Sequence, residues 1–174
     1  MKNLNRRNFL MFLLWLGGAA LFSASSKIGK VNAANYGPSA NMIVVWKSQR
    51  KMALFKNKTL LKTYTIRLGF NPIGHKQKEG DGRTPEGRYF ITHHNPNSAY
   101  HLSLGINYPN NNDLRRAKKL GLKPGKDIYI HGGPKNIFTH FFLDWTGGCI
   151  AVLDREIEEI YAMVPDGTVI YIYS

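Results

Sequence analysis

Short runs of β-branched and aromatic residues, rather than long amphipathic stretches, dominate the chain after residue 40 and restrict its fold most strongly. Polar clusters at 47–50 and 56–58 separate the first three runs, which predicts a meander of antiparallel strands. The predicted strands are Met42–Trp46, Met52–Phe55, Leu60–Leu68, Arg88–His93, Tyr100–Leu104, Ile128–His131 and Thr168–Tyr173. The Gly- and charge-rich stretch 71–87 is long for a simple connection, so we expect a functional loop there.

Two short helices are predicted in addition to the strands. Asn112 or Asp113 is expected to cap the first helix, which runs to Leu120. Asp154 is expected to cap the second helix, whose buried face follows the spacing i, i+3, i+4, i+7. That face consists of Ile157, Ile160, Tyr161 and Val164. Short strands with two small helices predict a mainly β fold, either a curved β-sandwich or a partly open barrel.

The first 33 residues have the composition of an export signal. They contain no acidic residue, and Arg6-Arg7 precedes an apolar run from 9 to 22. The small-residue pattern at 31–33 predicts cleavage by signal peptidase before Ala34. The apolar run is shorter than the roughly 20 residues that span a bilayer, which favours a cleaved signal peptide over a retained membrane anchor. Arg6-Arg7 also resembles a twin-arginine export signal, so twin-arginine and general secretory export both stay open.

Cleavage at this position would leave 141 residues, enough for one domain with a sizeable core. We predict a linker at 34–40 and one folded domain at 41–174. The net charge of +13 falls by the five basic residues of the signal to +8. An exported basic domain is suited to anionic wall polymers, carboxylate-rich peptides or a membrane surface. Nucleic acid is a poor partner, because the basic residues are scattered and the compartment is wrong.

The chain has a single cysteine, Cys149, which cannot form a disulfide within its own chain. An unpaired thiol in an exported protein is either reactive or an intermolecular partner. Gly147 and Gly148 precede it and leave open space beside the sulfur. Consecutive backbone N–H groups from Thr146 to Cys149 are positioned by sequence to converge on a tetrahedral oxyanion. This setting suits a nucleophile better than a core residue.

A thiol with an ordinary pKa of about 8.5 needs a neighbouring base to take its proton at neutral pH. His131 is the best candidate, because it ends a predicted strand and is followed by a Gly-Gly-Pro turn with exposed carbonyls. One of these carbonyls, such as that of Gly132, would fix the imidazole tautomer, a role often filled by a carboxylate. The residues alone therefore indicate a Cys/His acyl-transfer site, with inert buried residues as the alternative.

Three motifs in order resemble the L,D-transpeptidase (YkuD-type) catalytic domains. The first is His131-Gly132, followed after a spacer of 14 residues by Thr146-Gly147-Gly148-Cys149. The second is Gly80-Asp81-Gly82-Arg83-Thr84-Pro85-Glu86-Gly87, and the third is Ile106-Asn107-Tyr108-Pro109 with Asp113 after it. The resemblance covers about residues 42–173 and is therefore expected to hold for the whole folded domain.

The resemblance implies an enzyme that acts on the stem peptides of peptidoglycan. Cys149 would attack the carbonyl after the third residue and expel the terminal D-alanine, and His131 would be the base. The Gly132 carbonyl would orient the histidine, while backbone N–H groups around Gly147, Gly148 and Cys149 would form the oxyanion hole. An amine would resolve the thioester to give a cross-link or an attached protein, and water would resolve it to give hydrolysis. The family needs no metal and no organic cofactor.

The sequence departs from many members of that family at Gly147 and Ala151, which carry no polar side chain here. This variant resembles a subgroup that includes enzymes cutting or remodelling wall-linked bonds. Weaker substrate-binding candidates are Thr146, Trp145 and Arg83; Trp145 would either wall a substrate groove or fill the core.

Three functions stay open at this point: a transpeptidase, a hydrolase on the same site, and a non-catalytic wall-binding module. The presence of both Cys149 and His131 disfavours the third. The other histidines, His93, His94, His101 and His140, lack metal-ligand spacing, so no metal is predicted. His140 is expected to have a packing role rather than to line the cleft.

Overall fold

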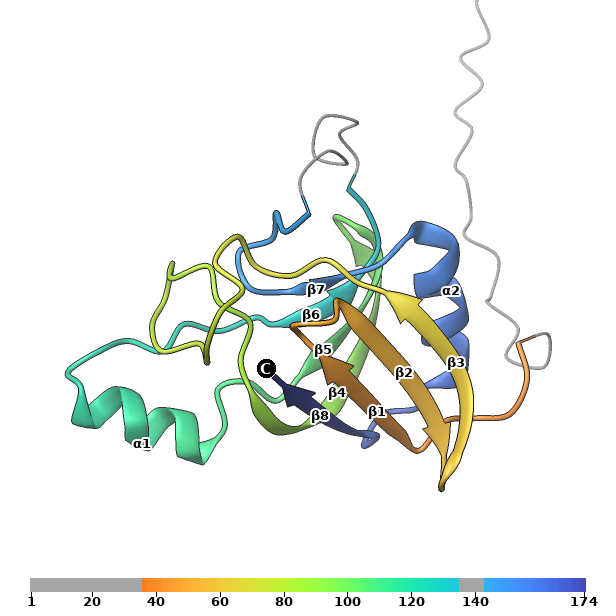
Figure 1. Ribbon diagram of the computed structural model, residues 1–174, viewed down its shortest axis with the longest axis horizontal. Coiled ribbons are helices and arrows are strands. Elements are labelled where there is room, and N and C mark those ends of the chain that lie inside the picture. Colours follow the sequence, from red (N-terminus) through yellow and green to blue (C-terminus); the bar gives the residue numbers. More distant parts are fainter. Residues whose placement is uncertain (1–35, 135–142) are drawn as a thin grey trace, which may run out of the picture.

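The computed structural model describes residues 36–134 and 143–174. The predicted signal peptide with its cleavage site and His140 lie outside these residues. The strands are β1 (Met42–Trp46), β2 (Lys51–Lys56), β3 (Thr59–Thr65), β4 (Gly87–Ser98), β5 (His101–Ile106), β6 (Tyr129–His131), β7 (Ile150–Ala151) and β8 (Val169–Tyr173). The helices are α1 (Asn111–Lys119) and α2 (Asp154–Met163). Figure 1 shows α1 projecting at one side of the sheet and α2 lying at the other.

The strands form one mixed sheet in the order β3-β2-β1-β8-β4-β5-β6-β7. β1, β2 and β3 make the predicted antiparallel meander, whereas β8 pairs parallel with β1, and β7 pairs parallel with β6. The sheet does not close into a barrel between its edge strands β3 and β7. The segment after β3 meets the region of β7 only through two isolated bridges, Arg67 with Ala151 and Gly69 with Thr146. The mainly β fold with two helices is as predicted from the sequence.

The core lies between the concave face of the sheet and α2, which packs against β5 and β6. Alternate residues of β1 point into it, so that Ile43 and Val45 are fully buried, as are Ile157 and Ile160 of α2. Burial of these apolar side chains stabilises the domain by roughly 1.5–3 kcal/mol for each of them. In the described part of the chain, no helix is long and apolar enough to cross a membrane.

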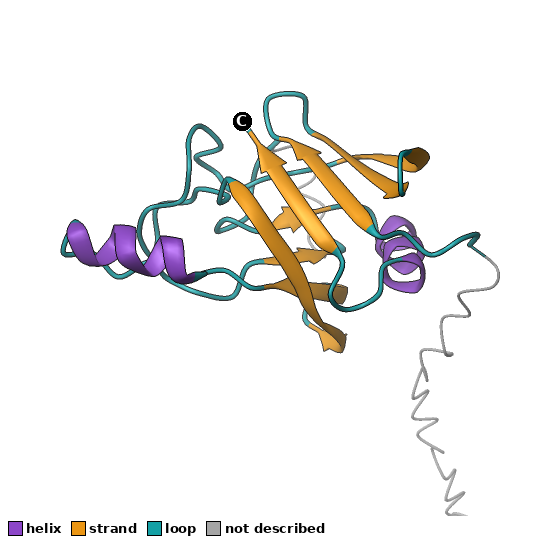
Figure 2. Ribbon diagram, turned by 90° about the horizontal axis from the view of Figure 1, so that it is seen from below, coloured by secondary structure: helices purple, strands orange, loops and turns teal. Residues whose placement is uncertain are grey.

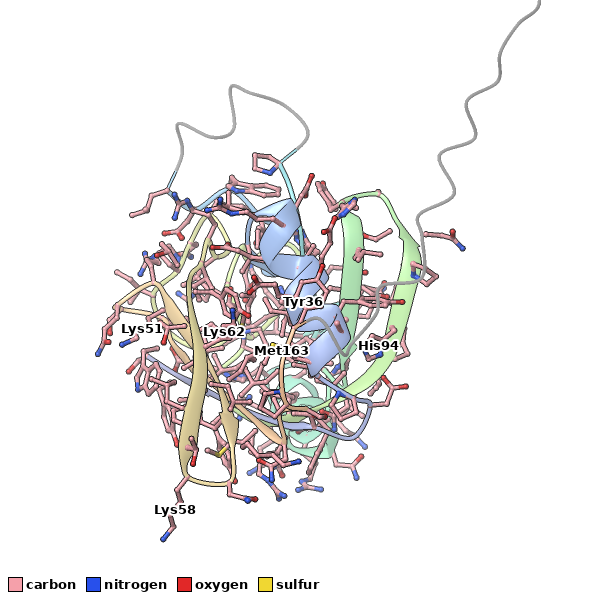
Figure 3. The ribbon with its side chains drawn as sticks, turned by 90° about the vertical axis from the view of Figure 1, so that its right-hand side faces the viewer. Tyr36, Lys51, Lys58, Lys62, His94 and Met163 are labelled. Atoms are coloured by element: carbon pink, nitrogen blue, oxygen red, sulfur yellow. The ribbon has the colours of Figure 1, made fainter. Side chains whose placement is uncertain are left out.

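Tyr36 and Ala40, in a segment predicted to be part of a linker, lie against this core, whereas residues 37–39 between them are exposed. The backbone N–H of Ala40 donates to the carbonyl of Met163 at 2.8 Å, and Ala40 is buried. Tyr36 packs against the core cluster, and Figure 3 shows it beside the end of α2 that carries Met163. The ordered contacts of the domain therefore begin a few residues before β1.

Several predicted strand boundaries are wrong. β3 ends at Thr65 instead of 68, because the chain leaves the ladder with β2 there and bridges to Ala151. β4 and β5 extend beyond their predicted ends, to Ser98 and Ile106. β7 was missed, since two residues are too few for a periodic signal.

The two helix caps also differ from the prediction. Asn110 caps α1, and its side chain accepts hydrogen bonds from the N–H groups of Asn112 and Asp113. Asn110 is selected because Asp113 then falls at the third helical position, where its carboxylate accepts from the Asn110 N–H at 3.0 Å. Leu153 is at the cap position of α2, where its N–H donates to the Glu156 carboxylate at 2.9 Å, while the Asp154 carboxylate accepts from Gly133 N–H at 2.7 Å.

Candidate active site

Cys149 lies directly before β7, at the rim of a cleft that also exposes the end of β6. β6 and β7 pair in parallel, with His131 opposite Ala151, so the histidine and the cysteine come from neighbouring strands. The Cys149 Sγ is 3.6 Å from the carbonyl oxygen of Asp127. The cleft has a volume of about 310 Å³ and is lined by Asn95, Ser98, Ala99, Tyr100, Ser103, Asp127, Tyr129, His131 and Cys149. The structure thus brings the predicted nucleophile and base to one cavity.

The His131 ring is held in one tautomer. Its Nδ1 lies 2.6 Å from the carbonyl oxygen of Gly132. Since a carbonyl oxygen only accepts, Nδ1 carries the proton and donates it, which leaves Nε2 with a free lone pair. Burial lowers the pKa of His131 more than the Gly132 carbonyl raises it. The imidazole is therefore neutral at pH 7 and able to accept a proton at Nε2.

The thiol of Cys149 is also held in its neutral form. Burial raises its pKa, and the backbone N–H of Tyr129 and the charge of Lys76 oppose that rise only in part, while Asp127 adds to it. Cys149 is the free cysteine of the described chain. A neutral thiol beside a neutral imidazole needs proton transfer at the moment of attack, which is general-base chemistry.

Two of the predicted glycines are required by close packing. A Cβ on Gly132 would lie 2.5 Å from Asp154 Oδ1 and 3.0 Å from the carbonyl oxygen of Tyr100. Gly148 has φ +133°, and a Cβ there would lie 2.6 Å from the carbonyl oxygen of Arg83. Gly147 is surrounded by open space instead. At Gly132 and at Gly148 the surrounding atoms therefore leave no room for a residue larger than glycine.

Thr146 organises the segment 144–149 before β7, which we call the cysteine loop. Its hydroxyl donates to the Cys149 carbonyl at 2.7 Å and accepts from the Gly148 N–H at 3.1 Å. Its backbone N–H donates to Leu68 at 3.0 Å, and its side chain is buried. The hydroxyl is therefore engaged within the loop, and the substrate contact expected of Thr146 stays a prediction.

A second anchor of this loop is the ion pair between Asp144 and Arg50. Arg50 Nε lies 3.0 Å from both carboxylate oxygens, and Arg50 Nη2 lies 2.6 Å from Oδ2. Asp144 also accepts from Leu68 N–H at 2.9 Å. This bidentate arrangement fixes the residue that precedes Trp145. The pairing joins residues 94 positions apart, so no local sequence signal could have found it.

Aromatic rings enclose His131 on two sides. The Tyr100 ring stacks on the imidazole at a centroid distance of 4.6 Å, and the Trp145 ring meets it edge-on at 5.7 Å. Trp145 is half-buried and walls a second groove of about 210 Å³, together with Arg67, Pro134, Glu156 and other residues. Trp145 thus lines a groove, and its predicted role in binding substrate there stays a prediction. Tyr100 was not predicted as a site residue.

The 71–87 stretch is an ordered loop that packs around two buried lysines, Lys76 within the loop and Lys47 just after β1. Lys76 pairs with Asp81 at 2.8 Å, and this contact with three backbone N–H groups outweighs burial and holds the pKa of Asp81 down to about 2. The backbone of Arg83 packs on Gly148, but its side chain extends toward Gly74 and does not line the cleft. The substrate-binding role expected of Arg83 therefore stays a prediction.

Metal-binding groups are absent from the described ranges: no three His, Cys, Asp or Glu side chains lie close enough to hold a metal ion there. His93 packs edge-on against Tyr129, His94 pairs with Asp166 at 2.7 Å, and His101 pairs with Glu158 at 2.7 Å. These three histidines therefore have packing and surface-pairing roles in the fold.

The family model for the L,D-transpeptidase catalytic domain (YkuD) matches residues 40–172. The chain belongs to the L,D-transpeptidase family. Its members act on peptidoglycan stem peptides. The putative L,D-transpeptidase YafK of Escherichia coli is 29% identical over 128 residues, covering 70% of this chain and 46% of the relative. The residues that line the Cys/His cleft all lie within the matched region.

Two similar solved structures come from other bacteria. The helical cell shape determining protein Pgp2 of Campylobacter jejuni (a K307A mutant) has a TM-score of 0.60 and 26% identity, over 79% of this chain and 48% of that chain. Bd1075 of Bdellovibrio bacteriovorus has a TM-score of 0.59 and 26% identity, over 78% of this chain and 48% of that chain. The chain spans about half the length of the relatives it matches.

Proposed function

We propose that this domain is a cysteine L,D-transpeptidase whose Cys149 forms a thioester with the third residue of a peptidoglycan stem peptide. The observation that carries the proposal is the hydrogen bond between His131 Nδ1 and the Gly132 carbonyl, in the cleft that Cys149 also lines. It leaves Nε2 as the free basic atom of a buried, neutral imidazole. Membership of the family supplies the substrate class.

The reaction proceeds in two halves. His131 Nε2 takes the thiol proton while the Cys149 sulfur bonds to the carbonyl carbon after the third residue. The tetrahedral intermediate then breaks its C–N bond, and the departing D-alanine amine receives the proton from His131. In the second half an acceptor amine attacks the thioester, His131 takes the amine proton, and the thiol leaves with it. No net charge and no redox change are produced.

The oxyanion is stabilised by backbone N–H groups of the cysteine loop. The Gly148 N–H donates to Thr146 at 3.1 Å, so the N–H groups of Gly147 and Cys149 are the better donors for the intermediate. Gly147 faces open space, which leaves room for a substrate carbonyl. We therefore assign the oxyanion hole to Gly147 and Cys149, with Gly148 shaping the loop.

We further propose that the acceptor amine binds in the groove walled by Trp145, whose ring meets the His131 imidazole edge-on. This groove contains both a cation, Arg67, and an anion, Glu156. An amino acid centre of a stem peptide carries an ammonium and a carboxylate, which is the complementary pair. Arg67 would bind the carboxylate bidentately and present the amine to the thioester.

Hydrolysis at the same Cys/His pair is the alternative, as an L,D-carboxypeptidase or as an enzyme that releases wall-linked protein. Water reaches an open cleft without any acceptor site, so the pair alone does not favour an amine. The similarity to a cell shape determining protein suggests that either activity would remodel the wall and affect cell shape. Both activities place the mature protein in the periplasm or the cell wall.

Products from a defined stem tetrapeptide separate these functions. The peptide is incubated with the mature domain and the products are analysed by mass spectrometry. A transpeptidase gives a cross-linked dimer and free D-alanine. A carboxypeptidase gives the tripeptide and free D-alanine. Absence of both products with folded protein, or full turnover by Cys149→Ala, would refute the proposed function.

Arg67 gives the acceptor assignment its own prediction. Arg67→Ala should lower the ratio of cross-linked product to hydrolysed product by about tenfold, because a charge-assisted hydrogen bond contributes roughly 1.5–3 kcal/mol. Arg155→Ala is the matched control, since Arg155 is exposed on the neighbouring helix α2 and lies outside the groove. An unchanged ratio in Arg67→Ala, measured by quantitative mass spectrometry, would place the acceptor elsewhere.

A further inference from the structure

The convex face of the sheet carries a row of aromatic side chains. Side chains on β8 alternate, so Ile170 and Ile172 point into the core while Tyr171 and Tyr173 point outward. Trp46 is the partner of Tyr173 on β1, and Phe90 lies on β4. We call Trp46, Phe90, Tyr171 and Tyr173 the aromatic face. Figure 2 shows β1, β8 and β4 from this side, with no helix of the described chain in front of them.

The aromatic face has a specific geometry. The rings of Tyr171 and Tyr173 are nearly parallel, with an interplanar angle of 7° and a centroid distance of 6.4 Å. Cations flank the row: Arg88 lies 4.7 Å from the Phe90 ring, and Lys51 lies 5.8 Å from the Trp46 ring. Tyr173 is 51% exposed. Trp46, Phe90 and Tyr171 are half-buried, so each presents part of its ring to the surface.

Beside the tyrosines the surface is hollowed into a groove of about 600 Å³, which we call the outer groove. Its polar lining includes Gln77, Glu86, Arg88 and Arg116. Among the described residues Arg88 forms no ion pair, whereas Arg116 pairs with Asp113 at 3.0 Å. The groove volume lies within the range of about 300–1,000 Å³ that is typical of ligand sites. It therefore combines flat aromatic rings with an amide, a carboxylate and a free guanidinium.

We propose that the outer groove binds the sugar backbone of peptidoglycan. A pyranose ring presents one face of C–H groups, which pack on the negative face of an aromatic ring, and it presents hydroxyl groups around its edge. Parallel Tyr171 and Tyr173 suit such faces, and Gln77 and Glu86 provide hydrogen-bond partners for hydroxyl and acetamido groups. Arg88 is available for a carboxylate on the attached peptide.

One loop connects this groove to the catalytic cleft. The 71–87 loop contributes Gln77 and Glu86 to the outer groove, and its Arg83 backbone packs against Gly148 of the cysteine loop. A polymer with a sugar chain and peptide branches would therefore contact both sites through one structural unit. The inference deepens the proposed function, since it names the sugar chain as a second part of the same substrate.

Binding is tested with Cys149→Ala, which keeps the substrate intact. Peptide-free glycan chains, prepared from peptidoglycan with an amidase, are titrated into this protein and followed by calorimetry. Adding Tyr171→Ser and Tyr173→Ser should weaken binding at least tenfold, which is about 1.4 kcal/mol. Leu60→Ser with Leu120→Ser is the matched control, because these side chains are 55% and 53% exposed, comparable to Tyr173. Circular dichroism melting verifies that each variant is folded.

Glycan that does not bind the folded Cys149→Ala protein, or binds the tyrosine variant equally well, overturns the inference. A dimer in sedimentation equilibrium that the tyrosine substitutions dissociate would also overturn it, by showing a second copy on this face. Kinetics distinguish the two proposals. If the outer groove fails alone, the Cys149 enzyme still turns over a sugar-free stem peptide. If the proposed function fails, that turnover is absent while glycan binding persists.

Discussion

At the scale of single residues, burial sets the protonation of the proposed base and the proposed nucleophile. It lowers the pKa of His131 and raises the pKa of Cys149, so both changes favour the neutral forms. An imidazolium–thiolate pair would need the opposite shifts. Both groups are therefore neutral at rest, and in the proposed mechanism the thiolate forms only as the substrate carbonyl is attacked.

This state predicts a particular pH dependence of alkylation. Iodoacetamide should react slowly with Cys149 at pH 7, because burial raises the pKa of the thiol in the folded protein. The rate should rise only at pH values above the ordinary thiol pKa of about 8.5. Intact-mass spectrometry over a pH series measures the rate, with an unfolded sample as the reference. A fast rate that is constant from about pH 5 to 8 would indicate a pre-formed thiolate.

How well residues were predicted depends on whether their signal is local. Cys149 and His131 were predicted to lie in one site, and they line one cleft, because a lone thiol after two glycines and a histidine at a strand end are visible in short windows. Tyr100 was missed, since its place over His131 depends on irregular pairing near the turn between β4 and β5. The contact of Arg50 with Asp144 was missed because it depends on the completed sheet.

At the scale of elements, the 71–87 loop is held to the sheet by one buried ammonium. Lys47, at the end of β1, donates to the carbonyls of Gly74 at 2.6 Å and Thr84 at 3.0 Å. It also pairs with Glu86 at 2.8 Å. Burial lowers the pKa of Lys47, and Glu86 opposes that shift. Through this contact β1 supports the loop that packs on the cysteine loop.

Lys47→Met should therefore destabilise the domain by about 2–4 kcal/mol, because buried carbonyls and a carboxylate lose their partner. Urea unfolding followed by circular dichroism measures the change. Lys62→Met is the matched control: Lys62 pairs with Glu159 at 3.5 Å but is 42% exposed, and such surface pairs contribute roughly 0–1 kcal/mol. Equal effects of the two substitutions would mean that the buried contacts of Lys47 do not hold the loop.

Elements with a repeated pattern were predicted well, and their ends were not. The meander follows from alternation, and helical periodicity placed Ile157 and Ile160 on the buried face of α2, but it missed Met163 and included Tyr161, which is only partly buried. The cap of α1 was misplaced because Asn110, Asn112 and Asp113 are all good capping residues, and only the reciprocal bond with Asp113 selects Asn110. β7 exists because β6 provides a partner for it, which a two-residue segment cannot show alone.

At the scale of the whole molecule, the sheet order explains how a short chain forms a domain with three separate surface grooves. Parallel pairing of β8 with β1 and of β7 with β6 brings distant segments together, and the sequence pattern did not predict these pairs. His131 and Cys149 line the cysteine cleft, Trp145 walls the groove that also contains Arg67 and Glu156, and the outer groove lies on the convex face. The β2–β3 hairpin, with Lys58 labelled at its tip in Figure 3, lies away from α1 (Figure 1).

The export predicted from the sequence concerns the whole chain and has a direct test. We propose that the first 33 residues are removed and that the mature protein begins at Ala34, because 31–33 matches the small-residue pattern of a cleavage site. Mass spectrometry of the protein from a periplasmic extract should give the N-terminal peptide that starts at Ala34. A protein recovered from membranes with residues 1–33 intact would show that the segment is an anchor.

The most direct test of the central claim is to trap the acyl-enzyme. The mature domain is mixed with a stem tetrapeptide that lacks an acceptor amine, quenched in acid within seconds and analysed by intact-mass spectrometry. We predict a mass increase equal to the tripeptide acyl group, mapped to Cys149 and absent in Cys149→Ala. Turnover of the tetrapeptide by Cys149→Ala at the rate of the unsubstituted protein, or an adduct on another residue, would contradict it.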